Sequence, residues 1–432
     1  MQQAAEWEEH HEAWLAPFLA TLGHKARRRM LPLYVSGLIG PGERKSMQPM
    51  AARLAAGDYD QLHHFVAAGI WDEAPLEAEL LVQADKLVGG EATIVVVGET
   101  ALPKKGEHSV GVAPQYVPDL GRNANCQTLV SVTLVRGDLP LPVALRLFLP
   151  ESWTSHPDRL QRAGVPLVRR GYWTKPEIAL AEIGRLIAAG ARFGCVLADA
   201  GYGQHASFRH GLTSRGLAWA VGISRYQEVY AAAVDPVSPA SGRGRLRRRP
   251  AAGPPSISAE QALAEAEARG EARLIGAREG RQARFAVLRV RPADGGALRA
   301  GDKRQQHLPG DETWLVGERS AAGETSYYLA SLPAEADLRA LARVIKARRA
   351  GEQAHRQLKE ELGLGHFEGR SWRGLHRHAL MTMIAFAFLQ SRRLARARQR
   401  LKQPQPALAA AGSEAVPPVS GRRAGKQDGS PG

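Results

Sequence analysis

Three acidic residues stand where a protein could build a metal site. Glu99 comes just after the β-branched run at residues 93–97, Asp199 ends the apolar run at 193–198, and Glu352 lies in a long stretch with helical spacing. Carboxylates at the ends of adjacent strands, joined by one from a packing helix, can converge on two metal ions about 3.5–4 Å apart. Oxygen ligands suit Mg²⁺ or Mn²⁺. The pattern therefore predicts phosphoryl-transfer chemistry.

Two of these acids also have simpler explanations. An aspartate before Ala-Gly-Tyr-Gly is good turn chemistry, so Asp199 could only cap the turn that follows it. Glu352 could be a solvated helix carboxylate that pairs with a neighbouring arginine. The functional interpretation therefore needs support from the rest of the sequence.

Several common catalytic motifs are missing from the sequence. The chain has no Gly-x-x-x-x-Gly-Lys-Ser/Thr, no His-Glu-x-x-His, no Gly-x-Ser-x-Gly and no Gly-x-Gly-x-x-Gly after a strand. The two cysteines, Cys126 and Cys195, lie far apart and outside any Cys-x-x-Cys pattern. ATP-driven enzymes, zinc proteases, serine hydrolases and disulfide scaffolds thus lose support.

The elements that must position the acids change in type along the chain. Apolar residues at helical spacing predict a helical region up to about residue 84. Strands are predicted at 93–97, 126–135, 141–149, 193–198 and 216–223, with a hairpin turn at 136–140 and a helix from 175 to about 189. This is the layout of a ribonuclease-H-like α/β core with a mixed sheet, although many mixed α/β folds share it.

The second half of the chain contains a loop, a partly β segment and two long helices. Residues 232–258 are rich in Pro, Ser, Gly and Arg, and the arginines between 243 and 249 could contact phosphates or simply be solvated. A helix is predicted at 257–273, strands at 285–290, 314–317 and 327–332, and long helices at 335–362 and 375–399. The segment from 403 onward lacks apolar periodicity and is predicted to be disordered.

These patterns divide the chain into five parts. We expect a helical N-terminal domain with a possible DNA-binding role at 1–88, and the first part of the catalytic core at 89–231. An insertion with the Arg-rich loop follows at 232–324, and the last part of the core, with the long Glu-bearing helix, at 325–400. A disordered basic tail completes the chain at 401–432.

The composition favours an anionic partner. The chain has 58 Lys and Arg residues against 43 Asp and Glu residues, which gives a formal net charge of +15. Most of the cations are arginines, which bind phosphate bidentately, although an arginine-rich codon set would also produce this bias. No run of eighteen apolar residues and no signal-peptide pattern occurs, so we expect a cytoplasmic protein without a membrane partner.

Three segments together carry a family resemblance. They are residues 102–113 (LPKKGEHSVGVA), 196–203 (VLADAGYG) and 358–374 (LKEELGLGHFEGRSWRG). On these segments the chain resembles bacterial insertion-sequence transposases of the DDE superfamily, in the group whose ribonuclease-H-like core is interrupted by a β-rich insertion. The likeness runs from about residue 30 to residue 393.

The resemblance implies roles for individual residues. It places the second catalytic aspartate on Asp199 and the third acid on Glu352. Family members often carry a Tyr, Arg, Glu, Lys signature on the last helix, and here Arg348 precedes Glu352 by four residues while Lys359 follows it by seven. That spacing puts all three on one helix face. The resemblance implies that Arg348 and Lys359 clamp DNA phosphates, whereas the tyrosine position of the signature is Ile345.

Three more basic residues are candidate DNA contacts. Lys104 and Lys105 follow Pro103, close in sequence to the first acid, where a surface turn would explain them equally well. Arg373 lies in the third matching segment and is a candidate phosphate contact.

The first acid departs most from the family pattern. Relatives usually carry Asp-Asp-Thr-Gly where this chain reads Gly98, Glu99, Thr100 and Ala101. Glu99 keeps a carboxylate before the threonine, but its stem is one methylene longer. A shift of about 1 Å in a reacting group can cost on the order of 100-fold in rate. The chain is therefore either a functioning Glu variant or a decayed copy that folds and binds DNA.

The resemblance implies a reaction and its partners. Mg²⁺ or Mn²⁺ held by Glu99, Asp199 and Glu352 would support cleavage at a transposon end and transfer of the freed strand into target DNA. The expected partners are double-stranded DNA and a second copy of the chain in a synaptic homodimer. A metal-dependent nuclease of the same fold that cuts without strand transfer, and a DNA-binding remnant that does not cut, remain alternatives.

Overall fold

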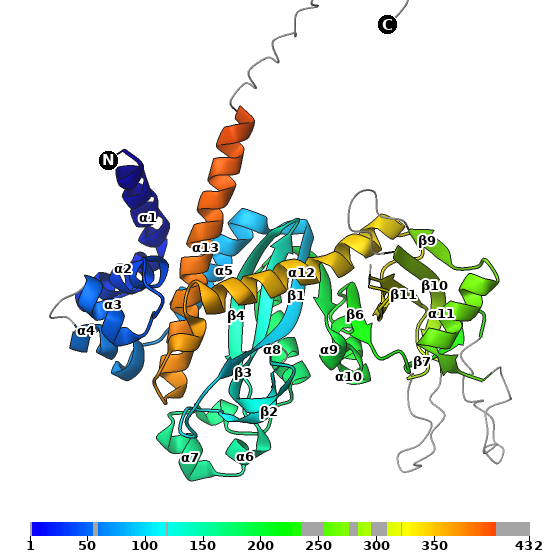
Figure 1. Cartoon of the computed structure of the whole chain (residues 1–432), viewed down its shortest axis with the longest axis horizontal. Coiled ribbons are helices and arrows are strands. Elements are labelled where there is room, and N and C mark those ends of the chain that lie inside the picture. The colour runs from blue at the N-terminus through cyan, green and yellow to red at the C-terminus, as the bar shows by residue number, and fades with distance from the viewer. Residues whose placement is uncertain are drawn as a thin grey trace, which may run out of the picture. The chain divides into compact units, whose positions relative to one another are not determined.

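The fold is a large mixed sheet with helices on both faces (Figure 1). The computed structural model describes residues 2–54, 59–117, 120–234, 255–275, 284–294, 309–320 and 322–402. The chain divides into two compact units, Met1–Arg392 and Arg393–Gly432. The predicted Arg-rich run at 243–249 and the predicted tail from 403 onward lie outside the described residues.

Strand β1 (Gly90–Pro103) runs through the middle of the core sheet. On one side it pairs antiparallel with β3 (Arg122–Arg136), which pairs in turn with both β2 (Ala113–Val117) and β4 (Leu139–Leu147). On the other side it is parallel to β5 (Phe193–Ala198), and β5 is parallel to β6 (Trp219–Ile223). The resulting order, β4-β3-β1-β5-β6, is that of the ribonuclease H fold, which confirms the predicted fold class.

A second group of strands extends this sheet beyond β6. β12 (Thr325–Ala330) pairs antiparallel with β6, and β11 (Thr313–Arg319) and β10 (Arg284–Pro292) follow it outward. β7 (Glu228–Ala231), β8 (Ile257–Ser258) and β9 (Arg273–Ile275) complete it, with helix α11 (Ala259–Ala268) packed on one side. The predicted β-rich insertion therefore continues the core sheet among the described residues.

Helices precede and interrupt the core strands. The N-terminal region contains α1 (Gln2–Thr21), α2 (Lys25–Ile39), α3 (Met47–Leu54), α4 (Tyr59–His63), a π-helical turn (His64–Ala68) and α5 (Ala74–Val88). The segment between β4 and β5 contains α6 (Glu151–Thr154), α7 (Pro157–Arg162), a 3₁₀ turn (Leu167–Arg169) and α8 (Lys175–Ala188). After β5 come α9 (Ala200–Gly203) and α10 (Ala206–Thr213).

Two long helices follow the last strand. They are α12 (Leu338–Glu360) and α13 (Trp372–Lys402), separated by a 3₁₀ turn (Leu364–His366). Figure 1 shows α12 running across the sheet from the insertion to the core. The sequence predicted both helices, with ends that differ by a few residues from those observed.

The two faces of the sheet carry different helices. Val96 of β1 and Leu197 of β5 belong to the same buried cluster as Leu341 and Ile345 of α12. The intervening residues, such as Val97, belong to the larger cluster that contains Ile178, Ala179, Ile183 and Leu186 of α8. Since side chains alternate along a strand, each strand contributes to both cores. This double burial explains why the sequence shows continuous β-branched runs here.

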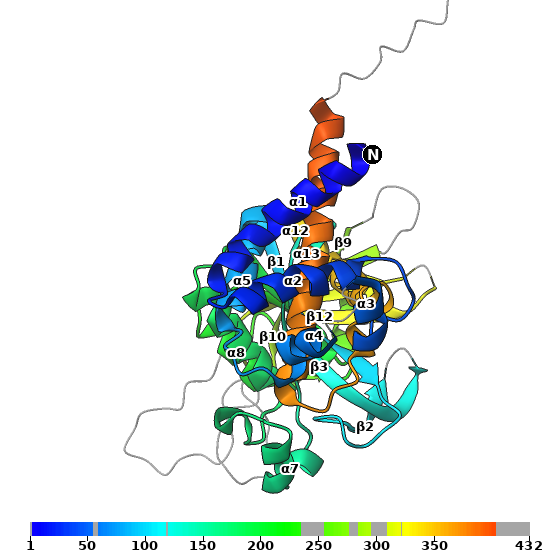
Figure 2. The same ribbon diagram turned by 90° about the vertical axis from the view of Figure 1, so that its left-hand side faces the viewer.

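Helix α13 joins the N-terminal helices to the core, and Figure 2 shows α1 and α2 beside it. Arg377 is fully buried and donates to the carbonyl oxygens of Gly69 (2.7 Å) and Trp71 (2.5 Å). The buried His378 bonds through Nδ1 to the Tyr34 hydroxyl (2.8 Å) and through Nε2 to the Gly363 carbonyl (3.0 Å). Polar side chains of this helix thus provide hydrogen-bond partners for backbone carbonyl groups of the surrounding loops.

A buried ionic network connects α5, β4 and α8. Arg146 Nη1 lies 2.6 Å from Glu77 Oε1, and Arg146 Nε lies 2.7 Å from Glu182 Oε1. Arg185 Nε donates to the second oxygen of Glu182 at 2.8 Å. The three elements come from distant parts of the sequence, so the network fixes the N-terminal helices against the core.

Candidate active site

Asp199 lies at the carboxyl end of β5, where the chain turns into α9. Its Oδ1 accepts the backbone N–H of Gly201 at 2.9 Å, so the side chain caps the first turn. A side chain at Gly203 would collide with the backbone of β6 at Gly222. Gly203, the last residue of the Asp-Ala-Gly-Tyr-Gly motif, therefore lets this turn lie directly against the sheet, which keeps Asp199 at the strand end.

Glu99 lies on β1 and forms an ion pair with Lys175, the first residue of α8. Burial raises the pKa of Asp199, and the nearby Glu99 carboxylate raises it further, while the Gly201 N–H and Arg348 act in the opposite direction. The two carboxylates are thus close enough to repel each other. The two predicted acids of the sheet therefore interact electrostatically at this end of the sheet, while the Glu99 side chain pairs with Lys175.

Glu352 and Arg348 form an ion pair one turn apart on α12, with 3.2 Å between Arg348 Nε and Glu352 Oε1. The Glu352 side chain is 58% exposed. Lys359 follows on the same face of the helix and is partly exposed. The predicted arrangement of Arg348, Glu352 and Lys359 on one helix therefore exists, and Arg348 also lies near Asp199.

The acids do not converge on a shared metal position. Among the residues with assigned structure, no group of three His, Cys, Asp or Glu side chains is placed to hold a metal ion. Glu99 is neutralised by Lys175, and Glu352 is neutralised by Arg348. The side chains as they stand therefore do not fit a three-carboxylate site for Mg²⁺ or Mn²⁺.

Two tyrosines and one glutamate near the acids were not predicted. The buried Tyr202 donates its hydroxyl to the Gly98 carbonyl at 3.1 Å. Tyr328 of β12 donates to Glu318 Oε2 at 3.3 Å, and burial raises the pKa of Tyr328 to about 12. Tyr202 lies inside the matching motif, which was a usable signal. Glu318 and Tyr328 come from the strands added to the sheet, and no spacing in the sequence relates them to α12.

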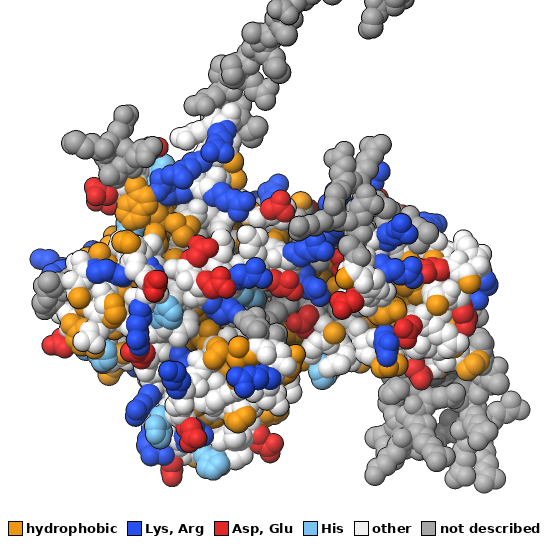
Figure 3. Space-filling model, viewed as in Figure 1, with side chains coloured by type: hydrophobic (Ala, Val, Ile, Leu, Met, Phe, Trp, Pro, Cys, Tyr) orange, Lys and Arg blue, Asp and Glu red, His pale blue; other side chains and the backbone are white. Residues whose placement is uncertain are grey.

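The predicted DNA contacts differ in their surroundings. Lys104 Nζ donates to the carbonyl oxygens of Gly365 (3.1 Å) and Phe367 (2.8 Å), and burial lowers the pKa of Lys104. Its ammonium group therefore supports the turn after α12. Lys105 and Arg373 are exposed. In Figure 3 basic and acidic side chains are interleaved over the face that carries α12.

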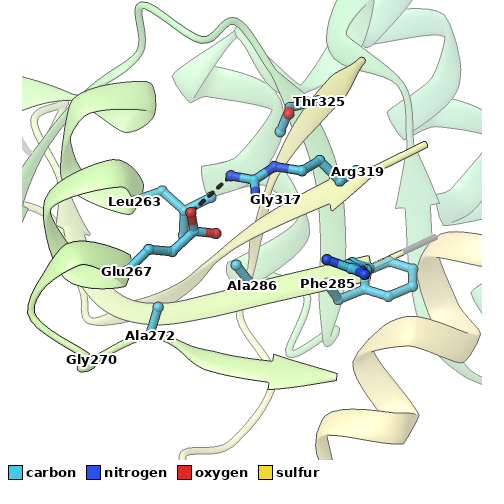
Figure 4. A pocket seen from close by; sticks show the side chains of 10 residues that line it. Leu263, Glu267, Gly270, Ala272, Phe285, Ala286, Gly317, Arg319 and Thr325 are labelled. Atoms are coloured by element: carbon cyan, nitrogen blue, oxygen red, sulfur yellow. Dashed lines mark hydrogen bonds and ion pairs between the residues drawn. The ribbon is translucent and has the colours of Figure 1, made fainter. Parts of the chain in front are cut away.

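A separate pocket of about 480 Å³ lies in the added part of the sheet. It is lined by residues of α11, β10, β11 and β12, and Figure 4 shows Glu267 and Arg319 pointing toward each other across it. Their ion pair measures 2.8 Å. Asp199 and Glu352 are not among its lining residues, so the pocket is not part of the candidate site.

Two sequence comparisons match this chain to known proteins. The family model of DDE superfamily endonucleases matches residues 17–284. The chain is 30% identical over 168 residues to the probable transposase for insertion sequence element IS701 of Microchaete diplosiphon. That alignment covers 39% of this chain and 41% of the relative, so it spans less than half of either.

A solved structure also resembles the chain at a distance. It is a cryo-EM structure of a piggyBac transposase synaptic complex with hairpin DNA, with a TM-score of 0.38 and 10% sequence identity. The similarity covers 87% of this chain and 72% of the other.

The chain belongs to the DDE superfamily of endonucleases, since the family model covers more than half of its residues. This confirms the resemblance seen in the sequence. Among the described residues, no helix is both long and apolar enough to cross a membrane.

Proposed function

We propose that this chain is a transposase that acts on double-stranded DNA, by metal-dependent cleavage followed by strand transfer with Mg²⁺ or Mn²⁺. The observation that carries the proposal is the position of Asp199. It stands at the end of β5, beside β1, in a sheet with ribonuclease H strand order and close to Arg348 of α12. Family membership supports the reaction class.

The basic side chains suit a DNA partner. The net charge of +15 favours phosphate binding, and Arg348, Lys359, Lys105 and Arg373 are the proposed phosphate contacts. We further propose that two copies of the chain bring two DNA ends together as a homodimer, and that the protein works in the cytoplasm on the bacterial nucleoid.

A second candidate function is DNA binding without efficient cleavage. The observation that favours it is that Glu99 and Glu352 are each engaged by a cation of the protein, Lys175 and Arg348. A nuclease that cuts without strand transfer has the same site, so only the reaction products distinguish it from a transposase.

The test is an assay of nicking and strand transfer on DNA that carries the element's own ends, with Mg²⁺ or Mn²⁺ present. The natural chain is compared with Asp199→Asn, because asparagine keeps the turn cap but removes the charge. Metal-dependent cutting with joined products, lost in Asp199→Asn, is expected for a transposase. Cutting without joining indicates a nuclease, and salt-dependent DNA binding without cutting indicates the binding function. Failure to bind DNA would refute both.

A further inference from the structure

Strand β1 presents alternate residues to two different helices. A methyl group added at Gly351 of α12 would lie 3.1 Å from Val96 Cγ1, and one added at Gly98 would lie 3.6 Å from His355 Cε1. Val96 and Gly98 therefore face α12. Because side chains alternate along a strand, Glu99 belongs to the other face, together with Val97. Its ion pair with Lys175 at the start of α8 agrees with this placement.

Asp199 lies on the same side of the sheet as Gly98. Leu197 of β5 packs in the α12 cluster, and the backbone of Asp199 is still extended (φ −79°, ψ −179°), so the alternation continues to Asp199. The parallel register pairs Val97 with Ala198, which makes Gly98 and Asp199 the next neighbours. Adjacent strands are about 4.8 Å apart. A carboxylate at position 98 would thus stand beside that of Asp199.

The acid of α12 lies on the same side. His355, which faces Gly98, follows Glu352 by three residues and so lies one turn further along the same helix face. A side chain at position 98 would point toward this face, with Asp199 next to it and Glu352 one turn away. The Glu99 side chain points away from it.

We propose that residue 98 is the ligand position of β1 in this metal site, and that the site of this chain is incomplete because position 98 is glycine. Glu99 does not replace the missing ligand, since it lies on the opposite face and pairs with Lys175. This inference rests on the proposed function, and it predicts slow metal-dependent cleavage by the natural sequence. An aspartate at position 98 would complete the carboxylate set.

The surroundings of Gly98 accept an added Cβ atom. The nearest atoms to an added Cβ at Gly98 are His355 Cε1 and Ser131 Oγ, both at the ordinary contact distance of 3.6 Å. Gly98 is not among the glycines with positive φ. Neither backbone strain nor a collision of the Cβ atom therefore opposes Gly98→Asp.

The experiment measures Mn²⁺ binding to the full chain in two ways. One is the loss of the electron paramagnetic resonance signal of free Mn²⁺, and the other is the increase in the melting temperature of the protein. The variants are Gly98→Asp, its uncharged match Gly98→Asn, Glu99→Gln and Lys175→Ala. We expect Gly98→Asp to bind Mn²⁺ at least about tenfold more tightly than the natural chain, while Gly98→Asn gains nothing. Without metal, Gly98→Asp should melt at a lower temperature than Gly98→Asn, because its carboxylate is held beside Asp199.

Two outcomes would overturn the inference. One is equal Mn²⁺ affinity in Gly98→Asp and Gly98→Asn. The other is tighter Mn²⁺ binding in Lys175→Ala, or loss of Mn²⁺ binding in Glu99→Gln, because either result would make Glu99 the ligand. These two variants decide the question even if Gly98→Asp does not fold. DNA affinity is measured in parallel. Tight Mn²⁺ binding by Gly98→Asp without DNA binding by any variant would contradict the proposed function but not this assignment.

Discussion

At the scale of single residues, the direction of a side chain matters as much as its type. The sequence predicted Asp199, Glu352 and Arg348 correctly as residues of a sheet end and a helix, and the structure places Asp199 and Arg348 near each other. The sequence could not show that Glu99 lies on the α8 side of the sheet. The motif that contains Glu99 gives residue types, but it does not indicate which face of the strand α12 covers. Whether these residues carry out catalysis remains a prediction.

Two neighbouring lysines test whether residues of the same type differ in role because their side chains have different surroundings. Lys104→Met should lower the free energy of unfolding by about 1–3 kcal/mol, because the carbonyls of Gly365 and Phe367 lose a charged donor. Lys105→Met removes the same charge from an exposed side chain and should change stability by less than about 0.5 kcal/mol. Urea unfolding of both variants measures the difference, and equal stabilities would contradict the structural role of Lys104.

At the scale of elements, the periodic patterns predicted most of the core strands and the long helices. α8 and β5 lie where the sequence placed them because each has a clear boundary. The Thr174 capping box begins α8, and the turn at Asp199 ends β5. The sequence missed β2 and the pairing of β12 with β6. These pairings join segments far apart in the chain, and local periodicity contains no information about which strands are neighbours.

The ionic network between α5, β4 and α8 predicts a large local effect. Arg146→Ala should lower the free energy of unfolding by about 3–5 kcal/mol, because the largely buried Glu77 would lose its ion-pair partner and the buried Glu182 would keep only Arg185 and the more distant Arg169. The matched control is Arg192→Ala, which removes a 63% exposed arginine from Asp85 and should cost at most about 1 kcal/mol. Denaturant unfolding measures both, and a loss below 1 kcal/mol in Arg146→Ala would exclude a structural role for the network.

The buried histidines of α13 predict sensitivity to acid. Burial lowers the pKa of His376 and His378 to about 4 in the folded protein, whereas an unfolded histidine titrates near 6.5. Between these values the unfolded chain binds protons that the folded chain does not, so stability falls as the pH drops from about 6.5 to 4. Each histidine contributes up to about 3 kcal/mol to this loss. Unfolding free energies at pH 7.5, 6 and 5 measure it.

The control for the acid effect is His378→Gln, which keeps a polar side chain but cannot titrate. Its stability should depend less on pH over the same range. An unfolding free energy of the natural chain that stays constant from pH 7.5 to 5 would show that these two histidines are not kept neutral by the fold.

At the scale of the whole molecule, the charge predicts how DNA binding depends on salt. The logarithm of the DNA association constant should fall linearly with the logarithm of salt concentration, because bound phosphates release counterions. Lys105→Met and Arg373→Met should each reduce the slope by about 1 if they contact phosphate. Lys104→Met should leave it unchanged. Fluorescence anisotropy at several salt concentrations gives the slopes, and a reduced slope in Lys104→Met would place its ammonium group on DNA.

The pairing of β12 with β6, after the strands of the added sheet, has a consequence for protein synthesis. In the sequence, the strands of the added sheet lie between Asp199 and Glu352. The ribosome therefore synthesises α12 only after those strands. At roughly 5–20 residues per second, a ribosome needs about 8–32 s to progress from residue 199 to residue 360. During that interval the nascent chain has its sheet carboxylates but no α12 over them. Any nuclease activity of this site is therefore confined to chains whose translation has passed the long helix.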